Sequence, residues 1–119
     1  MIRRHVAFAL LLLAAIPFAG HRAGAQTAPR IVEITAKKYE FSPAEITLKR
    51  GEPVVLRLSS LDRVHGFMQK DLEIDAEINP AHPTEISLTP TTSGRFLTIC
   101  DDYCGFGHAN MKMVIVVAD

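Results

Sequence analysis

The sequence predicts an all-β protein, folded as a single-domain Greek-key β-sandwich. Beyond residue 30, apolar and polar residues alternate over short stretches, which is the period of strands with one buried face. Gly and Pro turns separate these stretches, and no helical period occurs after the N-terminal segment. Many short strands joined by turns favour a sandwich. The chain has 119 residues, which is enough for one core and leaves no room for a second.

Residues 1–25 predict a signal peptide that is cleaved from the mature protein. A pair of arginines precedes an apolar run from Val6 to Ala19, and small residues end the segment at Ala25. The run is shorter than the ~20 residues that a membrane-spanning helix needs. We therefore expect a periplasmic or secreted domain of residues 26–119.

The charge of the chain argues against nucleic acid as a partner. The full sequence carries 13 Lys and Arg against 13 Asp and Glu. Without the three arginines of the signal peptide, 10 positive charges face 13 negative ones, a net charge of about −3. A mildly acidic domain is expected to bind no nucleic acid and to reach a membrane only through a partner protein.

Six stretches are predicted as strands: Ile31–Ala36, Glu45–Leu48, Pro53–Ser59, Thr84–Thr89, Arg95–Cys100 and Met111–Ala118. The first four alternate apolar and polar residues, whereas Arg95–Cys100 is rich in apolar residues and Met111–Ala118 is apolar on both faces. The second and third are separated by the turn Lys49–Glu52, which predicts a hairpin. Asp71–Ile78 alternates acidic with apolar residues and is interpreted as a strand or an extended loop. The simplest interpretation of its acidic edge, Asp71–Glu77, is a face exposed to solvent.

The segment from Cys100 to Met111 predicts a copper site. It holds four metal-ligating side chains between two strands, namely Cys100, Cys104, His108 and Met111. Thiolate and thioether ligands suit Cu(I), and imidazole suits both oxidation states of copper, whereas zinc rarely takes a Met ligand. His65, which follows a turn and precedes a Gly-Phe pair, is the candidate for a fifth ligand.

Simpler interpretations exist for these side chains. Two cysteines in an exported chain form a disulfide by default, but a Cys100–Cys104 bridge leaves the ligand-type residues around it unexplained. Met113 is expected in the core, Met68 in the core or at its rim, and His82 on an exposed loop.

The spacing C-x-x-x-C-G-x-x-H-x-x-M, with an upstream V-H-G-F, resembles the copper A domain of haem-copper oxidase subunit II and of nitrous oxide reductase. An ordinary blue-copper loop has one Cys where this one has two. The resemblance implies a cupredoxin fold over residues 26–119 and a dinuclear copper centre. The ligands it implies are two bridging thiolates (Cys100, Cys104), two imidazoles (His65, His108), the thioether of Met111 and the main-chain carbonyl of Asp102.

The resemblance also implies a function, single-electron transfer with a c-type cytochrome or a terminal oxidase or reductase. The acidic edge Asp71–Glu77 could steer a basic cytochrome. The alternative is a copper chaperone or store that delivers metal to such an enzyme. An enzyme with its own turnover is disfavoured, because no acid–base pair or nucleophile arrangement is evident.

This sequence departs from the copper A pattern in ways that bear on this function. Asp102 stands where oxidases usually have Glu, and the chain has no Trp and no membrane hairpin or catalytic domain. We therefore expect a free-standing carrier rather than an oxidase subunit.

Overall fold

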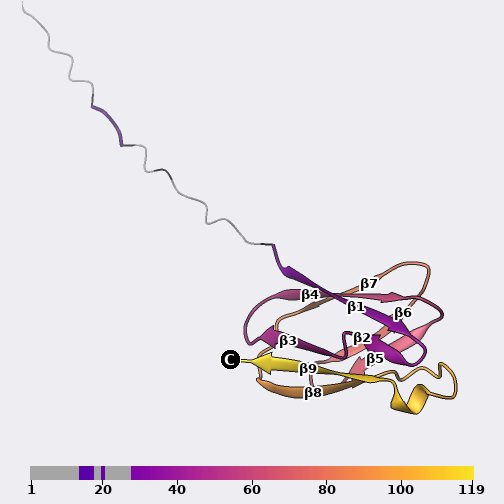
Figure 1. Cartoon of the computed structure of the whole chain (residues 1–119). Coiled ribbons are helices and arrows are strands. Elements are labelled where there is room, and N and C mark those ends of the chain that lie inside the picture. Colours follow the sequence, from indigo (N-terminus) through magenta and orange to yellow (C-terminus); the bar gives the residue numbers. More distant parts are fainter. Residues whose placement is uncertain (1–13, 18–19, 21–27) are drawn as a thin grey trace, which may run out of the picture.

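The computed structural model describes residues 14–17, 20 and 28–119, and residues 30–118 form a two-layered β-sandwich (Figure 1). The predicted signal peptide, residues 1–25, lies almost wholly outside the described residues and stays a prediction. Within the described part of the chain, no helix combines the length and the apolar character needed to cross a bilayer.

The two layers are mixed sheets. The four-stranded sheet has the order β2-β1-β4-β7 and contains β1 (Arg30–Lys37), β2 (Glu40–Ser42), β4 (Val54–Ser60) and β7 (Thr84–Leu88). The five-stranded sheet has the order β3-β9-β8-β5-β6 and contains β3 (Glu45–Lys49), β5 (His65–Gln69), β6 (Ile74–Ile78), β8 (Gly94–Ile99) and β9 (Lys112–Ala118). A short 3-10 helix, η1 (His108–Asn110), lies between β8 and β9. These strands confirm the predicted all-β sandwich.

Alternation along the strands places apolar side chains between the sheets. Ile34 of β1, Leu56 and Leu58 of β4 and Ile115 of β9 are all fully buried. β1 pairs with β4 in parallel, and β3 pairs with β9 in parallel, whereas the remaining pairs are antiparallel. Strands that are distant in sequence therefore become neighbours, and this brings the end of β8 beside β5.

The predicted hairpin between the second and third strands is wrong. β3 pairs with β9 in one sheet, whereas β4 pairs with β1 and β7 in the other. The intervening turn crosses between the layers and is tied to other segments, since Gly51 N–H donates to the Pro90 carbonyl at 2.7 Å. The apolar side chains of both strands point into the core. The two strands therefore face each other from opposite sheets and are not neighbours in one sheet.

The acidic stretch that was predicted as a strand or a loop is both. Its first residues form a turn, and Ile74–Ile78 form β6, the edge strand of the five-stranded sheet. Ile74 and Ile78 face the core, whereas Asp71, Glu73, Asp75 and Glu77 are exposed. The acidic edge is a solvent-exposed face, as predicted.

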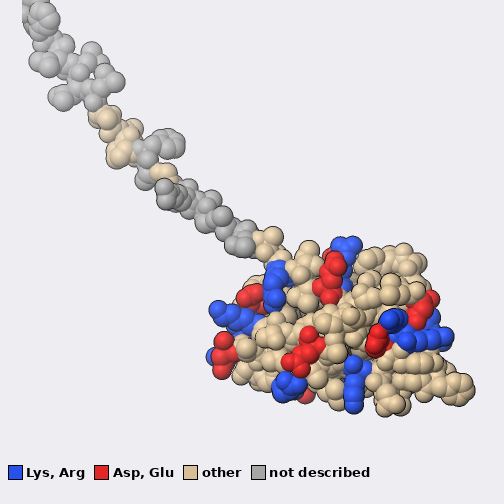
Figure 2. Space-filling model, viewed as in Figure 1, with Lys and Arg blue, Asp and Glu red and all other residues tan. Residues whose placement is uncertain are grey.

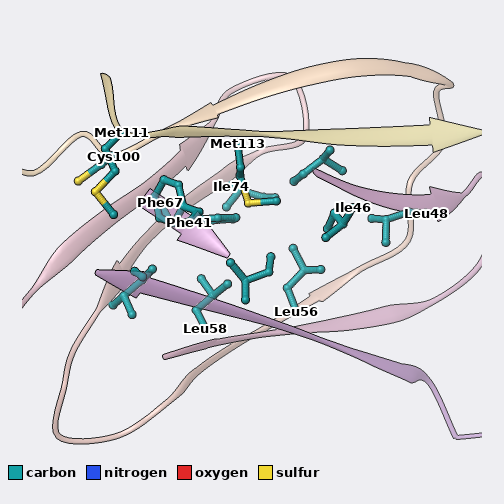
Figure 3. Close-up of a cluster of buried hydrophobic side chains, with 14 of the residues drawn as sticks. Phe41, Ile46, Leu48, Leu56, Leu58, Phe67, Ile74, Cys100, Met111 and Met113 are labelled. Carbon is teal, nitrogen blue, oxygen red and sulfur yellow. The ribbon is translucent and has the colours of Figure 1, made fainter. Parts of the chain in front are cut away.

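The core continues to one end of the sandwich, where the cysteines lie. Phe41 of β2 and Phe67 of β5 pack edge to face, with ring centroids 5.4 Å apart. Figure 3 shows Cys100 and Met111 at the end of this buried cluster, beyond Met113. Met113 is a core residue, as predicted, and the other two predictions of this kind also hold, because His82 is exposed and Met68 is half-buried.

Candidate metal centre

The loop from Cys100 to Met111 joins β8 to β9 at the end of the sandwich opposite the C-terminus (Figure 1). Its two ends are tied together, because Cys100 N–H donates to the Met111 carbonyl at 3.1 Å. Within it, His108 N–H donates to the Gly105 carbonyl at 3.1 Å. Gly105 has a φ of 130°, which side chains rarely adopt, so glycine is required there. We call this segment the ligand loop.

Cys104 is the centre of a cluster of soft donor atoms. Its Sγ lies 3.7 Å from Cys100 Sγ, 3.6 Å from His108 Nδ1 and 3.6 Å from Met111 Sδ. Cys100, Cys104 and Met111 are buried, and His108 is half-buried. The two cysteines are free thiols, and they do not form the alternative disulfide.

His65 reaches the same cluster from β5. Its ring, Cys100 Sγ and Cys104 Sγ offer ligand atoms that all lie within 4.8 Å of one another. His65 Nε2 lies 2.7 Å from Asp62 Oδ1, and its Nδ1 is buried without any hydrogen-bond partner. A hydrogen on Nε2, donated to the carboxylate, leaves a lone pair on Nδ1. An unsatisfied buried nitrogen is costly, and a metal ion would satisfy it.

Asp62 orients His65 and also accepts hydrogen bonds from two backbone N–H groups. Lys38 N–H donates to its Oδ2 at 2.7 Å, and Arg63 N–H donates to its Oδ1 at 2.7 Å. Burial opposes ionisation of this carboxyl, but the hydrogen bonds from Lys38, His65 and Arg63 outweigh burial and lower the pKa of Asp62 to about 2. Asp62 is therefore a fixed carboxylate, which is the usual partner of a metal-binding histidine.

The environment of Cys100 favours a thiol when no metal is bound. Burial, with the neighbouring Cys104, raises the pKa of Cys100 to about 11, although backbone hydrogen bonds from Gly66 and Asp102 oppose this. The thiol lies 3.1 Å from the Asp102 carbonyl oxygen, while the Asp102 side chain is exposed. Metal binding must displace the thiol protons, because thiolate is the ligand.

The residues present fit copper. Two thiols, a thioether and two imidazoles converge at the end of the core, and this soft donor set suits a metal that changes between Cu(I) and Cu(II). The structure brings together the six residues predicted from the sequence, with Asp102 contributing its main chain. It also adds Asp62, which sequence reasoning missed; an Asp three residues before a His is too weak a signal.

Comparisons with known proteins agree with this fold. Residues 6–117 match the family model described as "Cupredoxin-like domain". Cytochrome c oxidase subunit 2 of Thermus thermophilus is 32% identical over 96 residues, covering 79% of this chain and 71% of that protein. Nitrous-oxide reductase of Cupriavidus necator is 29% identical over 90 residues, covering 72% of this chain but only 14% of that protein.

A solved structure has the same architecture. The periplasmic domain of subunit II of cytochrome oxidase from Bradyrhizobium japonicum superposes with a TM-score of 0.70 at 17% identity, covering 79% of this chain and 87% of that one. A β-sandwich with thiol, imidazole and thioether donors at one end is the architecture of a cupredoxin-like domain with a candidate copper site. The chain belongs to the cupredoxin-like family, and its relatives include the two protein classes that its ligand spacing resembles.

Removing the Asp62 carboxylate is expected to weaken copper binding. Asp62→Ala frees the His65 ring and leaves the Lys38 N–H without its acceptor. Loss of such an outer partner commonly lowers metal affinity by about 10- to 100-fold. Competition with a chromophoric Cu(I) chelator measures the affinity, and Asp71→Ala, on the acidic edge, is the control. Unchanged affinity would mean that Asp62 does not orient a ligand.

Proposed function

We propose that this protein is an exported electron-transfer protein that holds two copper ions in a copper A-type centre. The observation that carries the proposal is the cluster around Cys104, in which two buried sulfurs 3.7 Å apart share one pocket with imidazole and thioether donors. A blue-copper electron-transfer site holds its single ion with one thiolate, so a second thiolate at this distance supports a bridged pair.

The residues of the proposed centre have distinct roles. Cys100 and Cys104 would hold both ions, His65 and His108 would each bind one of them, and Met111 and the Asp102 carbonyl would complete the set. When bound, the copper pair supplies one-electron redox chemistry. The protein contributes a frame, because β5 carries His65 while β8 and β9 hold the two ends of the ligand loop, and it excludes water from the sulfurs.

The surface around the ligand loop supports transfer to another protein. Leu61, Tyr103 and Phe106 are 71%, 67% and 100% exposed, and the Tyr103 ring lies 5.8 Å from the His108 ring between centroids. At the lower right of Figure 2, where this end of the sandwich lies, the visible surface is mostly uncharged. Exposed apolar side chains beside a half-buried ligand are suited to close contact with a redox partner.

The acidic edge supports a basic partner. Glu77 of β6 pairs with Gly66 of β5, and Gly66 lies against Asp101 of the ligand loop, so acidic residues extend from β6 towards the loop. A continuous acidic margin would attract a basic c-type cytochrome or a basic face of a terminal oxidase or reductase. Delivery of copper to such an enzyme is the second candidate function, since the same buried soft ligands would serve it.

Electron transfer and copper delivery can be distinguished experimentally, because an electron carrier keeps its copper whereas a chaperone releases it. The purified holo-protein should contain two coppers per chain, and its reduced form should be oxidised rapidly by a basic cytochrome with no loss of copper. The rate should fall as salt shortens the screening length to ~8 Å. Net copper transfer to a copper-free acceptor without fast electron exchange would contradict electron transfer and favour the chaperone function.

A further inference from the structure

The turn between β1 and β2 contacts the metal centre at two separate points. At the first, Lys38 N–H donates to Asp62 Oδ2 at 2.7 Å, and the other oxygen of Asp62 lies 2.7 Å from His65 Nε2. The Asp62 side chain thus links the backbone of this turn to His65, a candidate ligand on the other sheet.

At the second point, the Tyr39 ring lies against the ligand loop. A Cβ built on Gly107 would lie 2.8 Å from the Tyr39 Cβ and closer still to the ring. A Cβ on Gly105 would lie 2.9 Å from Tyr39 Cε1. These glycines stand between Cys104 and His108, so the ring packs on the part of the loop that joins two donors.

Gly107 shows that this close contact, and not backbone conformation, demands a glycine. Its φ of −87° and ψ of 5° are open to any residue. Gly105 differs, because its φ of 130° is itself unfavourable for a side chain. The three atoms nearest to a methyl group added at Gly107 all belong to Tyr39.

We propose that Tyr39 is a positioning residue that holds the ligand loop closed before any metal binds. The loop's ends are fixed by β8 and β9, but its middle rests on this ring. With the ring in place, the two thiols stay buried and His108 faces Cys104. The consequence for copper binding rests on the proposed function, whereas the packing itself is testable without copper.

Thiol labelling of the copper-free, reduced protein tests the packing. Iodoacetamide, a neutral reagent, should label Cys100 and Cys104 slowly in the unaltered protein, because both are buried. Tyr39→Ala should raise the rate by about tenfold through local opening. Tyr39→Phe keeps the ring and should match the unaltered protein. Phe106→Ala is the control within the loop, because that ring is 100% exposed, and it should leave the labelling rate of the copper-free protein unchanged.

A double-mutant cycle makes the test specific to the contact. Gly107→Ala should also speed labelling, because its methyl group meets the ring, but it should add nothing to a chain that already carries Tyr39→Ala. Equal effects of Gly107→Ala in both backgrounds, or slow labelling of Tyr39→Ala, would overturn the proposal. So would a rate that rises steeply from the lowest urea concentrations, since this indicates global rather than local unfolding.

The copper consequence has its own measurement. Tyr39→Ala should bind Cu(I) about tenfold more weakly in chelator competition, because binding must then close the loop. Unchanged affinity in a variant whose thiols label faster would refute the role in copper binding. An unaltered protein that binds no copper would instead refute the proposed function, and the thiol result would stand.

Discussion

Replacing Cys104 with Ser is expected to abolish the two-copper centre. The Cys104 sulfur contacts Cys100, His108 and Met111, so it is the atom around which the cluster is built. Serine offers a hard, protonated oxygen that does not bridge copper ions as thiolate does. The unaltered protein should hold two coppers with one unpaired electron shared between them, whereas the variant should hold at most one. Metal analysis and electron-spin resonance measure both properties.

Met111→Leu is the matched comparison for this change. It keeps the volume of a fully buried side chain and removes only the thioether, which would be a weak copper ligand. Copper should stay bound with an altered reduction potential. Cys104→Ser also buries a hydroxyl, at a cost of about 1–3 kcal/mol if it is unpaired, so thermal unfolding of the copper-free variant must show that it folds. A shared-electron spectrum in folded Cys104→Ser would contradict the bridging role.

Much of the fold was predictable because one face of most strands is buried. Alternation located β1, β3, β4 and β7, and short apolar runs located β8 and β9; the ends of all six agree with the prediction to within one residue. β2 was not predicted, since three residues are too few to show a period. β5 was missed for a different reason: four of its five residues are buried, on both faces, so its sequence does not alternate.

The connections and the supporting contacts were not predictable. A turn such as Lys49–Glu52 looks the same whether it joins neighbours in one sheet or crosses between two, because the apolar period is identical in both cases. The ligand spacing pointed to Cys100, Cys104, His108 and Met111. Local spacing carries no information on Asp62 or Tyr39, whose roles depend on packing between strands distant in sequence.

Gly66 shows how closely the two halves of the site approach. A Cβ at this position would lie 2.7 Å from Asp102 N and 2.9 Å from Asp101 N, and would also collide with the Asp101 carboxylate. Backbone atoms cannot swing aside as a flexible side chain can. The same close approach brings the Gly66 backbone into a hydrogen bond with Cys100, next to His65.

Gly66→Ala is therefore expected to separate β5 from the ligand loop. Overpacking of this kind costs about 1–3 kcal/mol in the free energy of unfolding. The larger effect is on the metal, because moving His65 away from the sulfurs should lower copper affinity by about 100-fold or more and remove the shared-electron spectrum. Urea unfolding of the copper-free protein and Cu(I) competition measure the two effects separately.

Gly51→Ala is the control that distinguishes the steric clash of an added methyl group from the backbone strain of replacing a glycine. Gly51 has a φ of 79°, so alanine is strained there, but nothing lies within 4 Å of the added Cβ. It should cost about 1 kcal/mol of stability and leave copper binding intact. If Gly66→Ala binds copper as tightly as Gly51→Ala does, β5 and the ligand loop are not as closely packed as this structure has them, and His65 reaches the metal by another arrangement.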